Sequence, residues 1–286
     1  MAKIEELVKA ASSKLKSAGI ENERMTASLL LAEILGRDTI YIIAHNRDEV
    51  ATETEARFQR AVERRCSGEP LQYITGRQEF YKRNFIVNPS VLIPRPETEL
   101  IVEKVVNLCK ELDLKSPTVL DIGTGSGCIA ISIASEIAEA AVFAIDISTL
   151  AIEVAKRNSE RHQVDRRVHF FVGDLTSAIF PEIKFDFCCT NPPYIDPNDR
   201  STLSREVKDF EPEIALFAQE KGLGLIARLL TECATITKPG GYFLCEIGFG
   251  QEEAVLAMVN REVWEIQPTI KDLQSIPRTV FLKRTL

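Results

Sequence analysis

Four consecutive residues, Asn191-Pro192-Pro193-Tyr194, combine groups that could bind and orient an –NH₂ group. The two prolines fix their own φ angles, so the segment is stiff and holds the Asn191 carboxamide and the Pro192 carbonyl in place. Both groups can accept hydrogen bonds from an –NH₂, and Tyr194 offers a flat face to a planar amide or base. The apolar run at 185–189 predicts a strand just before them, and open α/β sheets bind ligands at the carboxyl ends of their strands. The pattern therefore predicts a ligand site, with an ordinary proline turn as the alternative.

A second candidate site is the glycine-rich segment 121–127, which directly follows another apolar run. Glycine lets the backbone turn sharply and approach a ligand where any Cβ would collide. A dinucleotide-binding loop would read G-x-G-x-x-G, but here the third glycine comes one residue earlier. The spacing D-x-G-x-G-x-G instead resembles motif I of class I S-adenosylmethionine-dependent methyltransferases. This resemblance implies that the cofactor is bound by Asp121, Gly123, Thr124, Gly125, Ser126 and Gly127.

Two further aspartates follow predicted strands. Asp146 closes the run 141–145, about twenty residues beyond the glycines, where a carboxylate can accept hydrogen bonds from both ribose hydroxyls. Nicotinamide and adenosylmethionine cofactors are both bound in this way, and a helix N-cap is the alternative role. Asp174 comes after the run 168–172, at the position where this kind of fold usually contacts the adenine amino group, and a turn aspartate is its alternative.

The elements that must position these residues alternate from residue 96 onward. Helices are expected at 97–112, after the glycines and at 148–160. Strands are expected at 118–121, 141–145, 168–172 and 185–189, and later ones at 242–246 and 279–282, of which the last can run parallel or antiparallel. Strands that alternate with helices of this length predict parallel βαβ units in a three-layer α/β sandwich.

The first 70 residues instead predict a small helical domain. Apolar residues recur at helical spacing from Ile4 to Leu15 and again over residues 29–35, and Thr52 with Glu55 fits a capping box that would begin the next helix. A β-hairpin is expected from strands at 78–81 and 85–87. We therefore expect a helical domain at 1–70, a β-hairpin linker at 71–95 and an α/β domain at 96–286.

Composition limits the possible environments. The chain has 286 residues, a formal charge of −7 and a pI near 5.3, so no global positive field draws it to nucleic acid. The N-terminal residues carry charges where a signal peptide would be apolar, and no apolar run approaches the roughly 20 residues that span a bilayer. The seven cysteines form no C-x-x-C pair and mostly lie beside apolar residues. The sequence thus predicts a cytoplasmic protein with buried core cysteines, no metal site and no membrane contact.

A closer resemblance covers residues 68–286 and extends by pattern alone into the helical region. Its carriers are Gly68-Glu-Pro-Leu-Gln-Tyr73, Gln78-Glu-Phe-Tyr81, the segment 88–99 with Ile93-Pro-Arg-Pro-Glu-Thr-Glu99, Glu211-Pro212 with Ala215-Leu216, and Lys238-Pro-Gly-Gly241 with Glu246-Ile-Gly248. Together with Asn191–Tyr194, these segments resemble the PrmC/HemK family of protein-(glutamine-N5) methyltransferases.

The resemblance implies a Rossmann-like, seven-stranded, mainly parallel sheet and S-adenosylmethionine as cofactor. It implies that 1–70 is a substrate-recognition domain and 96–286 a methyltransferase domain. It also implies that the protein methylates the glutamine of the Gly-Gly-Gln loop in class I peptide-chain release factors, without direct contact with nucleic acid. The catalytic residues would be Asn191, Pro192 and Tyr194. Substrate contacts would also include Pro193, with Arg95 and Glu97 at the mouth of the site, and Asn191 and Leu175 would join the cofactor-binding set.

Three positions depart from the family pattern. The segment 217–222 lacks the usual paired glycines and aspartate, Lys82 stands where the hairpin commonly has glycine, and Leu175 stands where some relatives have an aromatic residue. The polar connection 196–212 is interpreted either as a lid ordered by the substrate or as a solvated loop.

Other functions remain open at this point. A related enzyme could methylate a glutamine of a ribosomal protein. A DNA N6-adenine methyltransferase shares Asn191–Tyr194 but should carry a target-recognition region and a basic face, which an acidic chain does not suggest. A non-enzymatic adenosylmethionine-binding module is the last alternative.

Overall fold

The computed structural model describes residues 2–180 and 182–285, and the chain divides into two compact units. The first unit runs to Arg77 and also includes Ser204–Phe210, and the second comprises Gln78–Leu203 and the chain from Glu211 onward. Within these described residues, no helix is long and apolar enough to cross a membrane.

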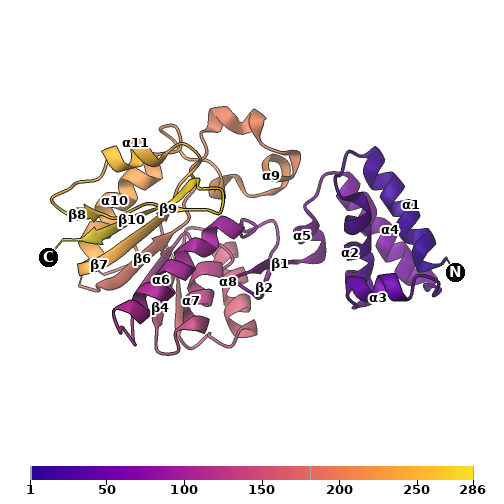
Figure 1. Cartoon of the computed structure of the whole chain (residues 1–286), viewed down its shortest axis with the longest axis horizontal. Coiled ribbons are helices and arrows are strands. Elements are labelled where there is room, and N and C mark those ends of the chain that lie inside the picture. The colour runs from indigo at the N-terminus through magenta and orange to yellow at the C-terminus, as the bar shows by residue number, and fades with distance from the viewer. Residues whose placement is uncertain (1, 181, 286) are drawn as a thin grey trace. The chain divides into compact units, whose positions relative to one another are not determined.

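The first unit is helical (Figure 1). Its helices are α1 (Ile4–Ser17), α2 (Glu23–Leu35), α3 (Thr39–Ala44), α4 (Thr52–Cys66), α5 (Leu71–Thr75) and α9 (Arg205–Phe210). The apolar stripes predicted from spacing form its core, where Leu15, Leu30, Leu31, Phe58 and Val62 are almost fully buried. The predicted helices are therefore confirmed, and the short helices α3, α5 and α9 were not anticipated.

The predicted capping box at Thr52 is wrong. Helix α4 begins at Thr52 itself, so Ala51 is the N-cap, and it provides no side-chain hydrogen bond. A capping box needs its threonine at the N-cap, with a backbone outside the helix. Here the backbone N–H of Glu55 donates to the carbonyl of Ala51, which moves the helix start one residue ahead of the pattern.

The second unit is built on a mainly parallel sheet. Its elements are β1 (Arg77–Phe80), β2 (Arg83–Ile86), α6 (Glu99–Glu111), β3 (Thr118–Ile122), α7 (Cys128–Glu136), β4 (Ala141–Asp146), α8 (Thr149–Arg161), β5 (Val168–Val172), β6 (Phe185–Thr190), α10 (Gly224–Ile236), β7 (Thr237–Glu246), α11 (Glu252–Ala257), β8 (Trp264–Ile266), β9 (Ile270–Lys271) and β10 (Pro277–Arg284), with 3₁₀ turns η1 (Pro96–Thr98), η2 (Pro197–Thr202) and η3 (Glu213–Ala215).

Among the described residues, seven strands follow the order β5-β4-β3-β6-β7-β10-β8, and the short β9 also pairs with β10. The five neighbouring strands β5, β4, β3, β6 and β7 are parallel to one another. Strand β10 runs antiparallel to both β7 and β8. The predicted mainly parallel sheet is therefore confirmed, and its last strand takes the antiparallel direction; with the short β9 the sheet that the structure describes has eight strands instead of the expected seven. Its path is the one expected of a class I methyltransferase fold.

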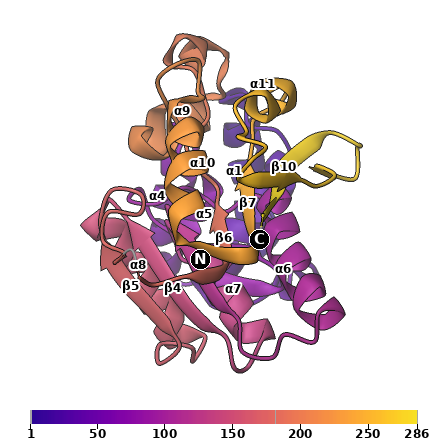
Figure 2. The same cartoon turned by 90° about the vertical axis from the view of Figure 1, so that its left-hand side faces the viewer.

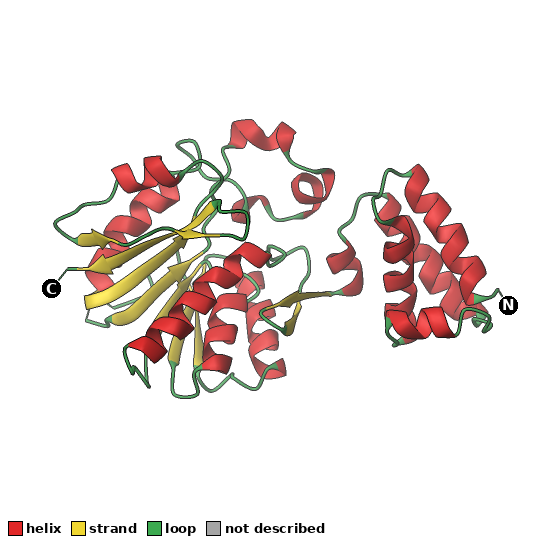
Figure 3. Cartoon of the chain, viewed as in Figure 1, coloured by secondary structure: helices red, strands yellow, loops and turns green. Residues whose placement is uncertain are grey.

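Helices cover both faces of this sheet, which is drawn in yellow between red helices in Figure 3. Figure 2 shows α10 on one side of β6 and β7 and α6 on the other. Each face of the sheet has its own hydrophobic core, and successive residues of β3 point into opposite cores. Val119 packs with α6 and α7 on one face, whereas Leu120 packs with α10 on the other. This is the three-layer arrangement that the alternating pattern predicts.

Several smaller predictions concern buried side chains and the hairpin. Six cysteines are buried and unpaired, as predicted, and Cys66 is half-buried. Trp264 is also a packing residue, 1% exposed, with its indole N–H donating to the carbonyl of Leu230. In the predicted hairpin, the turn residues Tyr81 and Lys82 both have left-handed φ angles, as a two-residue type I′ turn requires. Lys82 thus takes the conformation that glycine would take without strain.

The fold predicts a strong dependence on Phe187, which is fully buried in β6 and stacks on Tyr242 with ring centroids 5.7 Å apart. Phe187→Ala should lower the free energy of unfolding by about 3–5 kcal/mol, because it removes buried contacts and leaves a cavity. Phe249→Ala, at a side chain that is 79% exposed, should change it by less than about 0.5 kcal/mol. Fluorescence of Trp264, the only tryptophan, reports the unfolding of this unit in denaturant. Equal effects of the two substitutions would contradict this packing.

Candidate active site

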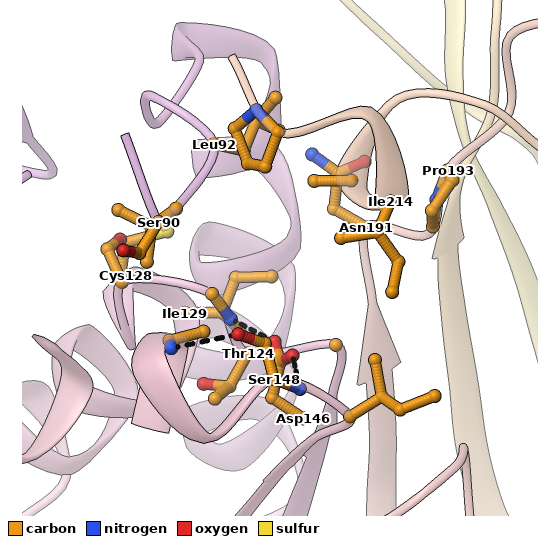
Figure 4. A pocket seen from close by; sticks show the side chains of 18 of the residues that line it. Ser90, Leu92, Thr124, Cys128, Ile129, Asp146, Ser148, Asn191, Pro193 and Ile214 are labelled. Atoms are coloured by element: carbon orange, nitrogen blue, oxygen red, sulfur yellow. Dashed lines mark hydrogen bonds between the residues drawn. The ribbon is translucent and has the colours of Figure 1, made fainter. Parts of the chain in front are cut away.

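A pocket opens in the second unit, where β3, β4 and β6 end. Figure 4 shows Thr124, Asp146 and Ser148 on one side of it, and Asn191, Pro193 and Ile214 across from them. Of the residues predicted from sequence, the pocket wall brings together Gly123, Thr124, Gly125, Ser126, Asp146, Asp174, Leu175, Asn191 and Pro193. Residues from four separate segments of the chain therefore share one cavity.

The glycine loop turns from β3 into α7 with left-handed φ angles at all three glycines. A Cβ added at Gly123 or Gly125 would meet no atom within 4 Å, so at these positions the backbone conformation alone favours glycine. A Cβ at Gly127 would lie 2.7 Å from Cδ1 of Ile131 and 3.2 Å from Cβ of Ala155, so Gly127 allows α7 and α8 to pack closely. The first two glycines shape an open cradle, and the third is a packing residue.

Asp121 lies beneath this loop rather than in the pocket. It is fully buried, and its Oδ2 accepts hydrogen bonds from the Thr124 hydroxyl (2.6 Å) and the backbone N–H of Ala130 (3.2 Å). Burial raises the pKa of Asp121 to about 7. Its contacts fasten the glycine loop to the first turn of α7, and a direct contact with the cofactor stays a prediction.

Asp146 lies at the edge of the pocket at the end of β4. Its Oδ2 accepts from the backbone N–H of Gly125 (2.8 Å) and its Oδ1 from that of Ser148 (2.9 Å). Ser148 is the N-cap of α8, which leaves Asp146 outside the helix and removes the alternative role considered for it. Burial raises the pKa of Asp146. Each carboxylate oxygen keeps lone pairs that can accept ribose hydroxyls.

Asp174 and Leu175 line the same pocket beyond β5. Asp174 forms an ion pair with Arg228, in which the Nη2–Oδ2 distance is 3.0 Å. Leu175 has a left-handed φ of 49° and packs partly against the core. Asp174 is thus held by a cation from α10, and its contact with an adenine amino group stays a prediction.

Asn191 faces the pocket and is joined to a buried polar cluster behind it. Its Nδ2 donates to the hydroxyl of Thr98 (3.0 Å), which donates to Oε2 of Glu246 (2.6 Å). The phenol of Tyr194 donates to the other oxygen of Glu246 (3.3 Å). Thr98 and Glu246 are each 2% exposed. Burial raises the pKa of Glu246 to about 7 and that of the Tyr194 phenol above its usual range.

The backbone of this segment is held separately. Gln251 donates from Nε2 to the carbonyl of Tyr194 (2.9 Å) and accepts from the N–H of Gly248 (2.8 Å). A Cβ at Gly222 would lie 2.0 Å from the same carbonyl of Tyr194, so only glycine fits there. The atypical segment 217–222 therefore keeps one glycine that the close approach requires.

Arg95 and Glu97 are not among the described residues that line this pocket, and neither are Pro192 and Tyr194. Arg95 instead forms an ion pair with Glu211, whose Oε2 also accepts from the N–H of Ile93 (3.2 Å). The role of Arg95 and Glu97 in contacting a substrate stays a prediction. The connection 196–212 contains η2 and α9, and its role as a lid likewise stays a prediction.

Sequence reasoning missed part of the wall. Leu92 and Pro94, with Ile214 and Ala215, contribute apolar surface from segments distant in sequence, and Thr98 adds a hydroxyl. Within the segment 88–99 the sequence assigns a role only to Arg95 and Glu97, and within 211–216 it assigns none. The one available signal was proline-rich, apolar sequence beside charged residues, which does not by itself specify a pocket.

Comparison with protein families gives two matches. The model of the PrmC N-terminal domain matches residues 6–76, and that of the methyltransferase small domain matches residues 98–207. The first match covers the helical region, for which the sequence patterns alone gave weaker support.

Curated relatives match over almost the whole chain. A release factor glutamine methyltransferase of Koribacter versatilis is 43% identical, with 93% of each chain covered. Another from Nitratidesulfovibrio vulgaris is 36% identical and covers 100% of this chain and 96% of its own length. Solved structures with the same fold include a methyltransferase from Pyrococcus furiosus (TM-score 0.53, 16% identity, covering 82% of this chain and 100% of its own).

The buried carboxyl of Asp121 predicts a pH-dependent stability. Between about pH 4 and pH 7 the unfolded chain releases this proton while the folded protein keeps it, so the free energy of unfolding falls as pH rises. In Asp121→Asn this contribution is absent. The stability of the variant relative to wild type should therefore increase by on the order of a few kcal/mol from pH 4 to pH 8.

Denaturant titrations at several pH values measure this difference, and Asp165→Asn, at an exposed aspartate of the same unit, is the control. A stability difference that does not change with pH would contradict the burial of a protonated Asp121.

Proposed function

The chain belongs to the release factor glutamine methyltransferase family, and we propose that it methylates the side-chain amide nitrogen of the glutamine in the Gly-Gly-Gln loop of class I peptide-chain release factors, with S-adenosylmethionine as methyl donor. The observation that carries this proposal is the orientation of Asn191. Its Nδ2 is engaged by Thr98, so its Oδ1 is left to accept a hydrogen bond from an amide across the pocket from the glycine loop.

The pocket has features that suit S-adenosylmethionine. Gly123 and Gly125 leave open space where side chains would stand, Asp146 offers acceptors, and Leu92, Ile129 and Leu175 supply apolar surface. These residues would hold the nucleoside of the cofactor and the part of it that lies against the glycine loop. When bound, the cofactor supplies an electrophilic methyl group on a positively charged sulfur.

The chain's own contribution is to orient and polarise the acceptor. A glutamine amide nitrogen is a poor nucleophile, because its lone pair is delocalised into the carbonyl. In the proposed mechanism, Oδ1 of Asn191 and the carbonyl of Pro192 accept hydrogen bonds from the two amide N–H groups and favour positive charge on that nitrogen as it attacks. Fixed dipoles aimed at developing charge are commonly the largest catalytic contribution.

Two further features complete the mechanism. The ring of Tyr194 stacks on the amide and limits its rotation, which keeps the nitrogen in line for transfer. The proton leaves the nitrogen to water after methylation, so the chain needs no general base. In the substrate, two glycines without side chains let the loop enter a narrow site, and residues 1–70 bind the rest of the factor.

Asn191→Ala should reduce kcat by at least about 100-fold, because it removes one of the two acceptors for the amide. The dissociation constant for S-adenosylmethionine should stay within about threefold, because the glycine loop and Asp146 are intact. Calorimetry measures the binding of S-adenosylmethionine. A separate assay, the transfer of a labelled methyl group to the release factor, measures kcat. The control is Asn107→Ala, on the exposed face of α6. Loss of both turnover and cofactor binding would contradict the role given to Asn191.

Asp146→Ala should instead weaken the binding of S-adenosylmethionine by about 10- to 100-fold, because charge-assisted hydrogen bonds to the ribose are lost. Asp165→Ala is the matched control, since this aspartate is exposed in the same unit. An unchanged dissociation constant in Asp146→Ala would show that the cofactor is bound elsewhere.

The proposed function itself is tested by transfer of labelled methyl to a purified release factor and to its Gln→Ala variant in the Gly-Gly-Gln loop. Label on the normal factor alone is the expected result. Label on neither protein, with cofactor binding intact, would contradict the proposed substrate and direct the search to ribosomal proteins.

A further inference from the structure

The inference concerns the buried polar cluster behind Asn191, which is formed by Thr98 and Glu246. Thr98 ends the turn η1, Glu246 ends β7, and Asn191 directly follows β6. A buried carboxylate is costly unless hydrogen bonds compensate it. Here Glu246 accepts hydrogen bonds from both Thr98 and Tyr194, so these two hydroxyls compensate the burial of its carboxylate.

The direction of these hydrogen bonds determines the orientation of the Asn191 amide. An ionised carboxylate has only acceptors, and each hydroxyl has a single proton. Thr98 and Tyr194 therefore both use their protons on Glu246. The oxygen of Thr98 can then only accept, so the group of Asn191 that faces it at 3.0 Å must be the donor, Nδ2.

The alternative orientation of the amide is unfavourable. If the carboxamide were rotated by 180°, its Oδ1 would face the oxygen of Thr98, and two acceptors would meet without a proton between them. The Thr98 hydroxyl and the Glu246 carboxylate together fix the amide of Asn191. Its Nδ2 points inward to Thr98, and its Oδ1 faces the ligand. The same carboxylate holds the phenol of Tyr194.

We propose that Thr98 and Glu246 are positioning residues, which fix the Asn191 amide with Oδ1 toward the acceptor amide and hold the Tyr194 ring beside it. This inference rests on the proposed function. It assigns the two residues no contact with the reacting atoms. Their effect passes through Asn191 and Tyr194, and the backbone of Tyr194 is held separately by Gln251 and by the close approach of Gly222. Substitutions at residues 98 and 246 therefore change side-chain orientation while that backbone support remains.

The chain offers a matched set of variants. Thr98→Val keeps the shape of the side chain but removes the hydroxyl, whereas Thr98→Ser keeps the hydroxyl. Thr279→Val is the control, because Thr279 is fully buried and pairs with Glu246 in the sheet. Within the described part of the chain, the hydroxyl of Thr279 has no hydrogen-bond partner, so its loss should not affect Asn191.

At about pH 8, where Glu246 is ionised, Thr98→Val should lower kcat by about 10- to 100-fold. KM for the release factor and the dissociation constant for S-adenosylmethionine should each stay within about threefold. Thr98→Ser and Thr279→Val should keep kcat within about threefold of wild type. A merely structural role would instead lower cofactor binding and kcat together, or would make serine as poor as valine.

Glu246→Gln is the second variant, in case Thr98→Val does not fold, and Trp264 fluorescence reports folding. The –NH₂ group of the new glutamine at position 246 can donate to the Thr98 oxygen. The Thr98 proton is then free to donate to Oδ1 of Asn191, which permits the Asn191 amide to be rotated by 180°. We expect kcat to fall by about 10-fold or more with cofactor binding unchanged. Normal kcat in both Glu246→Gln and Thr98→Val would overturn the inference.

A measurement without catalysis separates this inference from the proposed function. In protein labelled with ¹⁵N-asparagine, the side-chain N–H signals of Asn191 are identified by their absence from Asn191→Asp. They should shift in Thr98→Val and stay in place in Thr98→Ser and Thr279→Val. Shifted signals in an enzyme that fails to methylate release factors would contradict the proposed function alone. Unshifted signals in an enzyme that does methylate them would contradict the inference alone.

Discussion

The parallel pairing of β3 with β4 and with β6 is the constraint on which the site depends. Its register sets Ile122 opposite both Ile145 and Thr190. The next residue along each strand is Gly123, Asp146 or Asn191, so three segments that are distant in sequence begin the pocket at one level. Parallel strands all end at the same edge of the sheet, which is why a cofactor loop, an acidic residue and an amide-binding segment can meet there.

Buried polar residues then fix the loops on this edge. Asp121 ties the glycine loop to α7, and Glu246 ties Thr98 and Tyr194 together behind Asn191. Each carboxyl is almost fully buried, at a cost that its hydrogen bonds offset. In return the pocket-facing groups are held on rigid elements, as catalysis by preorganised dipoles requires.

Local features of the site could be predicted from the sequence, because they depend on neighbouring residues. The glycine spacing, the strand before Asp146 and the two prolines after Asn191 all specify local backbone geometry. The roles of Thr98 and Glu246 could not be predicted, because their contact joins residues 148 positions apart. The burial of Asp121 also depends on how α7 packs, and the predicted cap at Thr52 failed because backbone hydrogen bonds began the helix one residue earlier.

The most direct test of the account is to locate the transferred methyl group. Tandem mass spectrometry of a release factor, after incubation with the enzyme and S-adenosylmethionine, resolves which residue and which atom carries it. The account predicts a single methyl group on the side-chain nitrogen of the glutamine in the Gly-Gly-Gln loop. A methyl group on a carboxylate, on a lysine or on any other residue of the factor would contradict the role of the Asn191 amide as the acceptor for a glutamine side chain.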